Sequence, residues 1–281
     1  MIALCPNPFR DIDLKLTLEA SRLLHEAGYS TVICPVFAED EPGIIPQGIK
    51  TRELNEVVGM CSLIVVIGGD GTLLSVARKL HEYSARILGV NLGTKGFMTT
   101  LEPAELPLIL KAVQGEGTVS RRMKLDVSLC RNGEIIYSDC ALNDAVIHGF
   151  GDCIKLTAQC DGKTITSFSG DGIILATPTG STGYSMSAGG PIVEPDAENI
   201  IITPICAHVM GARSFVLDPA RTVDVKTEKL HGRRAYLSVD GNAVFDLANN
   251  DIVTVKRSEH YTDMVDMGLR SFYDIAFNKL T

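Results

Sequence analysis

The 281-residue sequence contains no tryptophan, and aromatic residues make up only 6% of it. It also lacks an apolar run near the roughly 18 residues that a membrane-spanning helix needs, and its apolar start, 1–8, is too short for a signal segment. Lys and Arg total 26 against 34 Asp and Glu, which gives a formal net charge of −8. Binding to nucleic acid or to an anionic membrane surface needs clustered basic residues, so we expect neither partner.

Paired cysteine motifs are also missing. No CxxC spacing occurs, which makes a zinc site improbable, and several cysteines lie within apolar runs that are typical of buried free thiols. Free thiols fit a reducing compartment, so the sequence predicts a cytoplasmic protein. The eight cysteines are Cys5, Cys34, Cys61, Cys130, Cys140, Cys153, Cys160 and Cys206.

The first part of the chain alternates predicted strands with predicted helices. Residues 63–67 are five consecutive apolar residues closed by two glycines, the pattern of a strand buried on both faces of a parallel sheet. Such an alternation implies right-handed crossovers. We expect strands at 2–5, 29–36, 63–67 and 86–90, helices at 13–27, 72–80 and 103–113 with a further helix before the central strand, and a surface loop at 37–48.

From about residue 119 the pattern changes to short alternating segments separated by turn residues, which predicts an all-β half. One helical stretch interrupts it after residue 182, and the tail at 274–280 has helical spacing. The expected strands are 125–130, 134–137, 145–148, 154–159, 173–177, 200–203, 223–226, 235–239 and 252–256.

A glycine-rich loop, Gly68-Gly69-Asp70-Gly71-Thr72, follows the central strand and precedes a helix. Backbone N–H groups at such a helix start form an anion site suited to phosphate. The loop does not match the dinucleotide-binding fingerprint, because Leu74 stands where that motif has its third glycine. The chain also has no P-loop, because Thr157 stands where that motif needs its first glycine. Asp70 would repel phosphate unless it has a cation partner or transfers a proton. The alternative is a tight turn in which Asp70 or Thr72 only caps the helix.

This loop resembles a signature shared by NAD kinases, by lipid kinases of the diacylglycerol and sphingosine type and, with Ser for Thr, by phosphofructokinases. A second stretch, Thr177–Pro191, is rich in hydroxyl groups, which suit a ribose, an amide or a phosphate, although a Ser/Thr turn capping a helix is an alternative. It resembles the NAD kinase motif TGSTAYSLSAGGP, which the other two families lack. Further segments similar to NAD kinases are 91–98, 142–144 and 238–241.

The resemblance implies an α/β plus all-β fold: a Rossmann-like parallel-sheet domain at 1–115 that binds the phosphate donor, a β-sandwich-like NAD-binding domain at 116–262, and a tail at 263–281 that packs on the first domain. Carried over position by position, it makes Asp70 the base and Asn143 and Asp144 ligands of the adenosine portion of NAD. The implied NAD contacts are Asp70, Gly71, Ser75, Asn143, Asp144, Ser169, Asp171, Thr182, Gly183, Tyr184, Ser185, Met186, Ser187 and Asn242. The implied phosphate loop is Gly68, Gly69, Gly71 and Thr72, and no residue is assigned as a metal ligand.

Three positions depart from the family pattern: Ser75 replaces Arg or another polar residue, Gly183 replaces Ala, and Ser169 replaces a basic residue. Lys95 is expected to contact either phosphate or solvent, and His148 and His208 are interpreted as structural.

The implied activity is transfer of a phosphoryl group from ATP, or another donor, to the adenosine 2′-hydroxyl of NAD⁺. Mg²⁺ is the expected cofactor because the transferring group carries charge, and a homodimer or homotetramer is the expected assembly. Two alternatives stay open: a lipid or sugar kinase that shares the glycine loop, and a dinucleotide-binding protein without turnover, which the three departures suggest. Transfer to a lipid or sugar, or NAD binding without NADP⁺ formation, would distinguish them.

Overall fold

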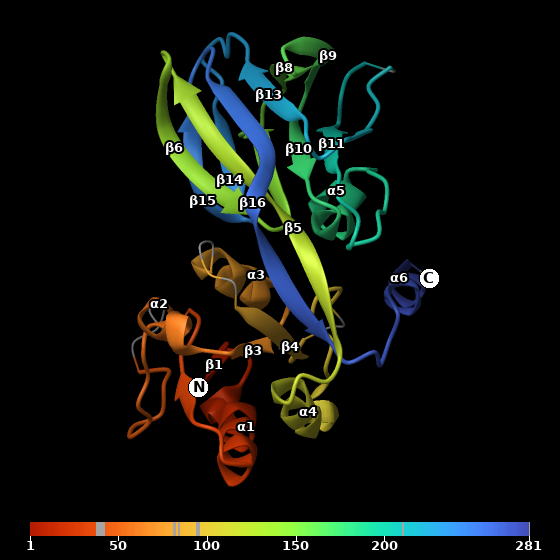
Figure 1. The fold of residues 1–281 in the computed structure, drawn as a ribbon. Helices are drawn as coiled ribbons and strands as arrows, with labels where there is room; N and C mark the ends of the chain where they lie inside the picture. The colour runs from red at the N-terminus through yellow and green to blue at the C-terminus, as the bar shows by residue number, and fades with distance from the viewer. Residues whose placement is uncertain (38–42, 81–82, 84, 94–95, 210, 281) are drawn as a thin grey trace. The chain divides into compact units, whose positions relative to one another are not determined.

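The computed structural model describes residues 1–37, 43–80, 83, 85–93, 96–209 and 211–280 (Figure 1). Part of the expected loop at 37–48 and the predicted contact of Lys95 therefore lie outside the described residues. The chain divides into two compact units, Met1–Arg121 with Thr262–Thr281 (unit 1) and Arg122–Tyr261 (unit 2). Two strands, β5 (Thr118–Arg131) and β16 (Ile252–Asp266), contribute to both.

Unit 1 is built on a parallel sheet in the order β2-β1-β3-β4, and the end of β16 lies parallel to β4 with Asp263 paired to Arg86. The segments between its elements include 3₁₀ turns at Ile12–Leu14, Val58–Met60 and Pro103–Leu108. Its remaining elements are β1 (Ile2–Pro6), α1 (Lys15–Glu26), β2 (Thr31–Ile33), α2 (Leu54–Val57), β3 (Leu63–Gly68), α3 (Asp70–Lys79), β4 (Arg86–Asn91), α4 (Ile109–Val113) and α6 (Phe272–Leu280).

β3 is buried at every residue, as its apolar run predicts, because helices cover both faces of the sheet. Figure 1 shows α1 and α4 on one face and α3 on the other. The first face packs Leu24 of α1 and Ile109 of α4 against Leu4 and Val65 of the sheet. This packing fixes the carboxyl end of β3, from which the glycine loop leaves the sheet.

Unit 2 is a sandwich of two sheets. A six-stranded antiparallel sheet has the order β12-β11-β10-β7-β14-β15, and the second sheet contains β5, β6, β16, β13, β8 and β9. A core that includes Leu125, Ile147, Leu175 and Val253 lies between them. The other elements of unit 2 are β6 (Glu134–Ala141), β7 (Asp144–Gly149), β8 (Ile154–Cys160), β9 (Lys163–Gly170), β10 (Gly172–Ala176), the 3₁₀ turn Thr179–Thr182, α5 (Tyr184–Ser187), β11 (Ile200–Ile205), β12 (Phe215–Leu217), β13 (Thr222–Thr227), β14 (Ala235–Val239) and β15 (Asn242–Leu247).

Several element boundaries differ from the expected ones for identifiable reasons. α1 begins at Lys15 because Leu14 has a left-handed φ of 54°, and the Asp11 carboxylate accepts hydrogen bonds from the N–H groups of Leu16 and Thr17 at 2.9 Å. The expected helix at 103–113 is divided, because Pro107 has no N–H to donate and the segment before Ile109 is a 3₁₀ turn. Among the described residues, no helix is both long and apolar enough to cross a membrane.

Candidate active site

The glycine loop connects β3 to α3 with almost no intervening residues. α3 begins at Asp70, and its N-cap is Gly69, whose N–H donates to Thr72 Oγ1 at 3.4 Å. Thr72 is buried, and its Oγ1 also accepts from Asn7 Nδ2 at 3.1 Å. A Cβ on Gly68 would lie 2.5 Å from Thr72 Oγ1, so this close approach requires a glycine. The prediction that Thr72 helps to cap the helix is confirmed by this hydrogen bond from the N-cap N–H, whereas the prediction that Asp70 is the N-cap is wrong.

The Asp70 carboxylate instead contacts the loop after β4. Oδ2 accepts a hydrogen bond from Phe97 N–H at 2.7 Å, and Oδ1 accepts from the N–H groups of Met98 and Thr99, each at 3.2 Å. Thr99 Oγ1 lies 3.4 Å from the same oxygen. A Cβ on Gly96 would overlap Asp70 Oδ1, so the backbone of this loop lies directly against the carboxylate. Both oxygens of Asp70 thus have fixed directions.

Three strand ends meet around this loop. Asn7 follows β1 and donates from its backbone to Ile67 O at 2.9 Å, while Leu92 follows β4 and donates to Gly68 O at 2.6 Å. These are carboxyl ends of parallel strands, the edge at which open α/β sheets bind ligands. The N-terminus of α3 lies at this edge, and a helix N-terminus favours the binding of an anion.

Arg10, which the sequence analysis did not select, brings a positive charge to this edge. Its Cζ lies 3.9 Å from where a Cβ of Gly69 would be, and its Nη1 lies against Gly93. Arg10 is exposed, and within the described part of the chain no carboxylate lies within ion-pair distance of its guanidinium. An exposed guanidinium beside two glycines is suited to a phosphate.

In unit 2, three of the selected segments meet at one edge of the six-stranded sheet. Asp144 begins β7, and the antiparallel pairing places it beside Ala176, the last residue of β10. β14 lies on the other side of β7 and ends at Val239, which pairs with Ala145. The segments 142–144, 177–187 and 238–242 are therefore neighbours, although 32 or more residues separate each from the next.

Asp240 holds the Asn143-Asp144 pair in place. Its Oδ2 accepts from Leu142 N–H at 2.7 Å, and its Oδ1 accepts from the N–H groups of Asn143 at 2.8 Å and Asp144 at 3.0 Å. Burial, and to a smaller extent the charge of Asp240, raises the pKa of Asp144 to about 7. Burial also raises the pKa of Asp240, against the lowering effect of its three N–H donors. The shared burial of two acids favours protonation of Asp144 near neutral pH.

The hydroxyl-rich segment packs on the same pair. Thr177 Oγ1 donates to Leu142 O at 2.6 Å and accepts from Gly180 N–H at 3.0 Å. Within the described structure, the buried Asn143 Oδ1 and Thr179 Oγ1 make no hydrogen bond. Buried polar atoms without partners are rare, so these two point to a ligand that completes them.

Gly183 is the N-cap of α5 and not a helix-interior residue, with φ −94° and ψ −132°. The expectation that it is helical is therefore wrong. A Cβ there would lie 3.3 Å from Gly180 O and within 4 Å of Asn143 Nδ2 and Asp144 Oδ2. The position thus borders the polar edge, where extra bulk would face ligand-binding groups.

The structure does not bring all selected residues of unit 2 to this edge. Asp171 and Ser169 precede β10, at the opposite end of that five-residue strand from Thr177. At about 3.4 Å per residue, the six-residue step along β10 separates Asp171 from Thr177 by roughly 20 Å. Partial burial, then the neighbouring Tyr236 and Cys206 and the charges of Asp171 and Asp144, raise the pKa of Tyr184. This spacing suits an elongated ligand that lies along β10.

Other selected residues have structural partners. Ser185 is fully buried, and its hydroxyl lies 2.8 Å from Thr203 Oγ1. Thr182 Oγ1 donates to Thr179 O at 3.2 Å, and Asn242 Nδ2 donates to Asp240 O at 3.3 Å. Gly71 and Ser187 are exposed, and Ser75 and Met186 are half-buried.

An aromatic surface at the opposite end of β7 from Asp144, where His148 pairs with Gly172, was missed from sequence. His148 stacks on Tyr236 with ring centroids 5.7 Å apart, and Phe150 meets Tyr236 edge-on at 6.5 Å. His148 Nδ1 also lies 2.6 Å from Gly149 O, and His208 Nδ1 lies 3.8 Å from Cys153 Sγ. His148 and Tyr236 pair across β7 and β14, so period-2 alternation puts them on the face that carries Asp144.

Comparison with known proteins gives concordant matches to both units. The family model of the ATP-NAD kinase N-terminal domain matches residues 14–117, and that of the ATP-NAD kinase C-terminal domain matches residues 142–267. The NAD kinase of Acetivibrio thermocellus is 34% identical over 284 residues, which covers 99% of this chain and 96% of the relative. The NAD kinase of Geobacter sulfurreducens is 40% identical over 241 residues, covering 85% and 82%.

Two solved structures resemble the chain along nearly its whole length. Yeast NADH kinase complexed with NADH superposes with a TM-score of 0.84 at 26% identity, over 97% of this chain and 84% of that one. An NAD kinase from Archaeoglobus fulgidus in complex with ATP has a TM-score of 0.76 at 26% identity, covering 98% and 99%. These matches confirm the predicted fold class, a parallel α/β domain followed by an antiparallel β domain.

Proposed function

The chain belongs to the ATP-NAD kinase family and phosphorylates NAD to NADP, and we propose that Asp70 is the base of this reaction. The supporting observation is the fixed orientation of its carboxylate at the carboxyl end of β3, beside the N-terminus of α3. A lipid or sugar kinase and a binding protein without turnover are disfavoured, because the relatives over nearly the full chain are NAD kinases.

The proposed reaction accounts for every group that moves. The 2′-hydroxyl oxygen of the NAD adenosine attacks the γ-phosphorus of ATP, the bond from that phosphorus to the bridging oxygen breaks, and ADP leaves. The hydroxyl proton passes to the Asp70 carboxylate, which requires an oxygen of Asp70 within hydrogen-bond reach of the hydroxyl. One of the loop N–H donors, such as that of Phe97, must share this oxygen with the substrate.

The donor phosphates are proposed to bind along Gly68, Gly69, Gly71 and Thr72, at the α3 N-terminus. Arg10 supplies the positive charge that the loop lacks, and its guanidinium offers several N–H donors to phosphate oxygens. The positive charge of Arg10 offsets the repulsion between the Asp70 carboxylate and the donor phosphates.

A divalent metal, Mg²⁺ being the expected ion, fits the residues at this edge. Among the described residues no three His, Cys, Asp or Glu side chains cluster as a metal site, and Asp70 is the carboxylate of the loop. Mg²⁺ commonly takes one or two carboxylates together with substrate phosphates and water. When bound, the metal would neutralise charge on the transferring phosphoryl group.

The adenosine portion of NAD is proposed to bind at Asn143 and Asp144. The carboxyl oxygens of Asp144 accept hydrogen bonds from ribose hydroxyls, and Asn143 Oδ1 and Thr179 Oγ1 gain the partners they lack in the free protein. The rest of the dinucleotide follows β10 past Tyr184 toward Asp171 and Ser169. Gly71, Ser75, Thr182, Gly183, Ser185, Met186, Ser187 and Asn242 complete the proposed contact set.

All eight cysteines lie in described segments and all are free, which supports a reducing compartment, and we place the enzyme in the cytoplasm. A homodimer or homotetramer is the proposed assembly.

The reaction is tested by incubating the purified protein with NAD⁺, Mg²⁺ and either ATP or polyphosphate, and by detecting NADP⁺ with an NADP-specific dehydrogenase. We expect NADP⁺ with ATP. Formation of NADP⁺ with polyphosphate but not with ATP would contradict the proposed donor. Tight NAD⁺ binding without formation of NADP⁺ from any donor would contradict the reaction.

A further inference from the structure

We propose that Arg270, which lies between β16 and α6, is a positioning residue that holds Asp70 in its reactive orientation. The inference rests on the proposed role of Asp70 as the base. All the residues involved belong to unit 1, and Arg270 reaches Asp70 through the loop at 96–102.

The first link is the loop itself. Its backbone N–H groups at Phe97, Met98 and Thr99 supply three of the hydrogen bonds that fix the Asp70 carboxylate. A shift of this segment would turn Asp70 or remove its donors. A displacement of about 1 Å in catalytic geometry can cost on the order of 100-fold in rate.

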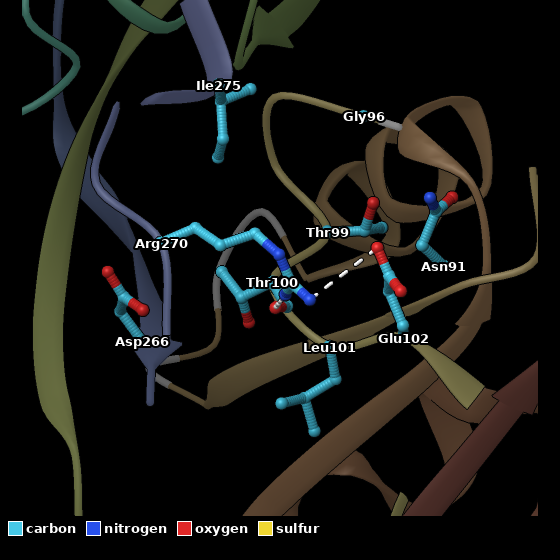
Figure 2. A pocket seen from close by; sticks show the side chains of 9 residues that line it. All are labelled: Asn91, Gly96, Thr99, Thr100, Leu101, Glu102, Asp266, Arg270 and Ile275. Carbon is cyan, nitrogen blue, oxygen red and sulfur yellow. Dashed lines mark hydrogen bonds and ion pairs between the residues drawn. The ribbon is translucent and has the colours of Figure 1, made fainter. Parts of the chain in front are cut away.

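The second link joins the loop to Arg270. Arg270 Nη1 donates to the carbonyl oxygen of Thr100 at 3.3 Å, one residue beyond the last N–H that binds Asp70. Thr100 Oγ1 in addition donates to Val265 O at 3.4 Å, at the end of β16. Figure 2 shows the Arg270 side chain extended over Thr100, toward Glu102.

Two glutamates fix the guanidinium from the other side. Nη2 lies 2.7 Å from Glu105 Oε1 and Nη1 lies 3.1 Å from Glu105 Oε2, a two-pronged pair, and Glu102 Oε1 lies 3.5 Å from Nη2. The hydrogen bond from Arg270 lowers the pKa of Glu105. Glu105 Oε2 also accepts from Glu102 N–H at 2.8 Å, so the pair is tied to the backbone just after the loop. The planar fork of arginine serves all three acceptors, which a single lysine nitrogen does not.

Side-chain packing leaves one side of the loop open. A cavity of about 400 Å³, its open mouth included, is lined by Gly96, Thr99, Thr100 and Ile275 together with Arg270 (Figure 2). The tail makes two further contacts with the loop: the Phe97 ring centroid lies 6.4 Å from that of Phe272 and 4.2 Å from Lys279 Nζ. Because this cavity lies next to Thr99 and Thr100, side-chain packing does not restrain that side of the loop. The hydrogen bond from Arg270 supplies the restraint there.

The experiment is a double-mutant cycle between Arg270→Gln and Asp70→Asn, with kcat and KM measured for NAD⁺ and ATP. We expect Arg270→Gln to lower kcat about tenfold or more while each KM stays within about threefold. In the Asp70→Asn background, Arg270→Gln should change kcat by less than about twofold, because the group that it positions is absent. Arg270→Lys keeps the positive charge but not the planar guanidinium, so it should lower kcat less than Arg270→Gln does.

Arg257→Gln is the matched control, because Arg257 forms a similarly exposed pair with Glu198 at 2.8 Å in unit 2. It should leave kcat unchanged. An equal loss of kcat from Arg270→Gln with and without Asp70 would overturn the positioning role, and so would an unchanged kcat in Arg270→Gln. If Asp70→Asn alone kept full activity, the proposed base would be wrong instead. Should Arg270→Gln not fold, Arg270→Lys is carried through the same cycle and judged by the same criteria.

Discussion

At the residue scale, Asp70 combines a chemical and a structural role, and its replacement affects both. Asp70→Asn removes the proton acceptor, so kcat should fall by about 10²- to 10⁴-fold, the usual contribution of general-base catalysis. The amide NH₂ would also face an N–H donor at Phe97 or at Met98 and Thr99, so the melting temperature should fall by a few degrees. Steady-state kinetics and thermal melts measure the two effects.

Thr99→Val separates these effects, because it removes the hydroxyl that contacts Asp70 Oδ1 and retains the backbone donors. It should lower the melting temperature slightly, and kcat should stay within about threefold because the retained N–H groups keep the Asp70 carboxylate in place. An Asp70→Asn variant that loses less than tenfold in kcat would contradict the assignment of Asp70 as the base.

Arg10 is expected to act on the phosphate donor. Arg10→Ala should raise the KM for ATP about tenfold or more and leave the KM for NAD⁺ within about threefold, because the exposed guanidinium lies beside the two glycines of the phosphate edge. Lys15→Ala is the control: Lys15 is an exposed cation five residues further along the chain that pairs with Asp13 at 3.8 Å, and its loss should change neither KM. Equal rises for both substrates would argue against a specific phosphate contact.

The buried Asp144 predicts a pH-dependent stability. Its pKa is about 7 in the folded chain against about 3.9 when unfolded, so the folded state holds an extra proton between these values. That proton contributes stability at low pH, and the contribution is lost as the pH rises toward 7. The melting temperature of Asp144→Asn, relative to the unmodified protein, should therefore increase from pH 5 to 7 and level off above pH 7. Asp246→Asn, at an exposed pair, should show no such trend.

At the scale of elements, the start of α5 decides what a side chain at Gly183 does. Alanine in place of a helix-interior glycine would add about 1 kcal/mol of stability, but Gly183 is an N-cap, where that gain does not apply. Gly183→Ala should leave the melting temperature within about 2 °C and the KM for NAD⁺ within about threefold. A stabilisation of several degrees in thermal melts would contradict the N-cap assignment.

The elements that could be predicted are those whose local pattern and burial agree. β3 and α3 follow from five apolar residues, two glycines and a 3.6-residue period. β9, with the sequence KTITSFSG, was missed because polar residues occupy both of its faces. β5 and β16 were predicted too short, since they continue beyond their apolar alternation through tertiary pairing.

The contacts of the candidate site could be predicted only in part, because local sequence pattern does not report long-range contacts. Asp70 was selected because a carboxylate in a phosphate loop is unusual, but its partners at 97–99 follow 27 to 29 residues later and are brought there by the fold. Asp240 and Arg270 were not selected for a similar reason. Their acceptors and donors lie 96 and 165 or more residues away, and no local spacing reports such contacts.

At the scale of the whole molecule, the proposed metal serves the reaction and not the fold. Excess chelator should abolish NADP⁺ formation and leave the melting temperature of the free protein unchanged, since no cluster of three metal-ligating side chains occurs among the described residues. Added Mg²⁺ should restore activity. Turnover that persists in chelator would contradict the proposed metal dependence, and a lowered melting temperature would reveal a structural ion.

The division of unit 1 into two chain segments has a consequence for biosynthesis. Residues 122–261 separate Arg121 from Thr262, so a ribosome that adds about 5–20 residues per second needs roughly 7–30 s to pass from the first segment to the second. During that time β4 has no β16 beside Arg86 and Ile87, and its edge is open to strands of other nascent chains. Unit 2 is continuous and can complete its folding first, so the half of the enzyme that carries Asp70 matures last, with the final twenty residues of the chain.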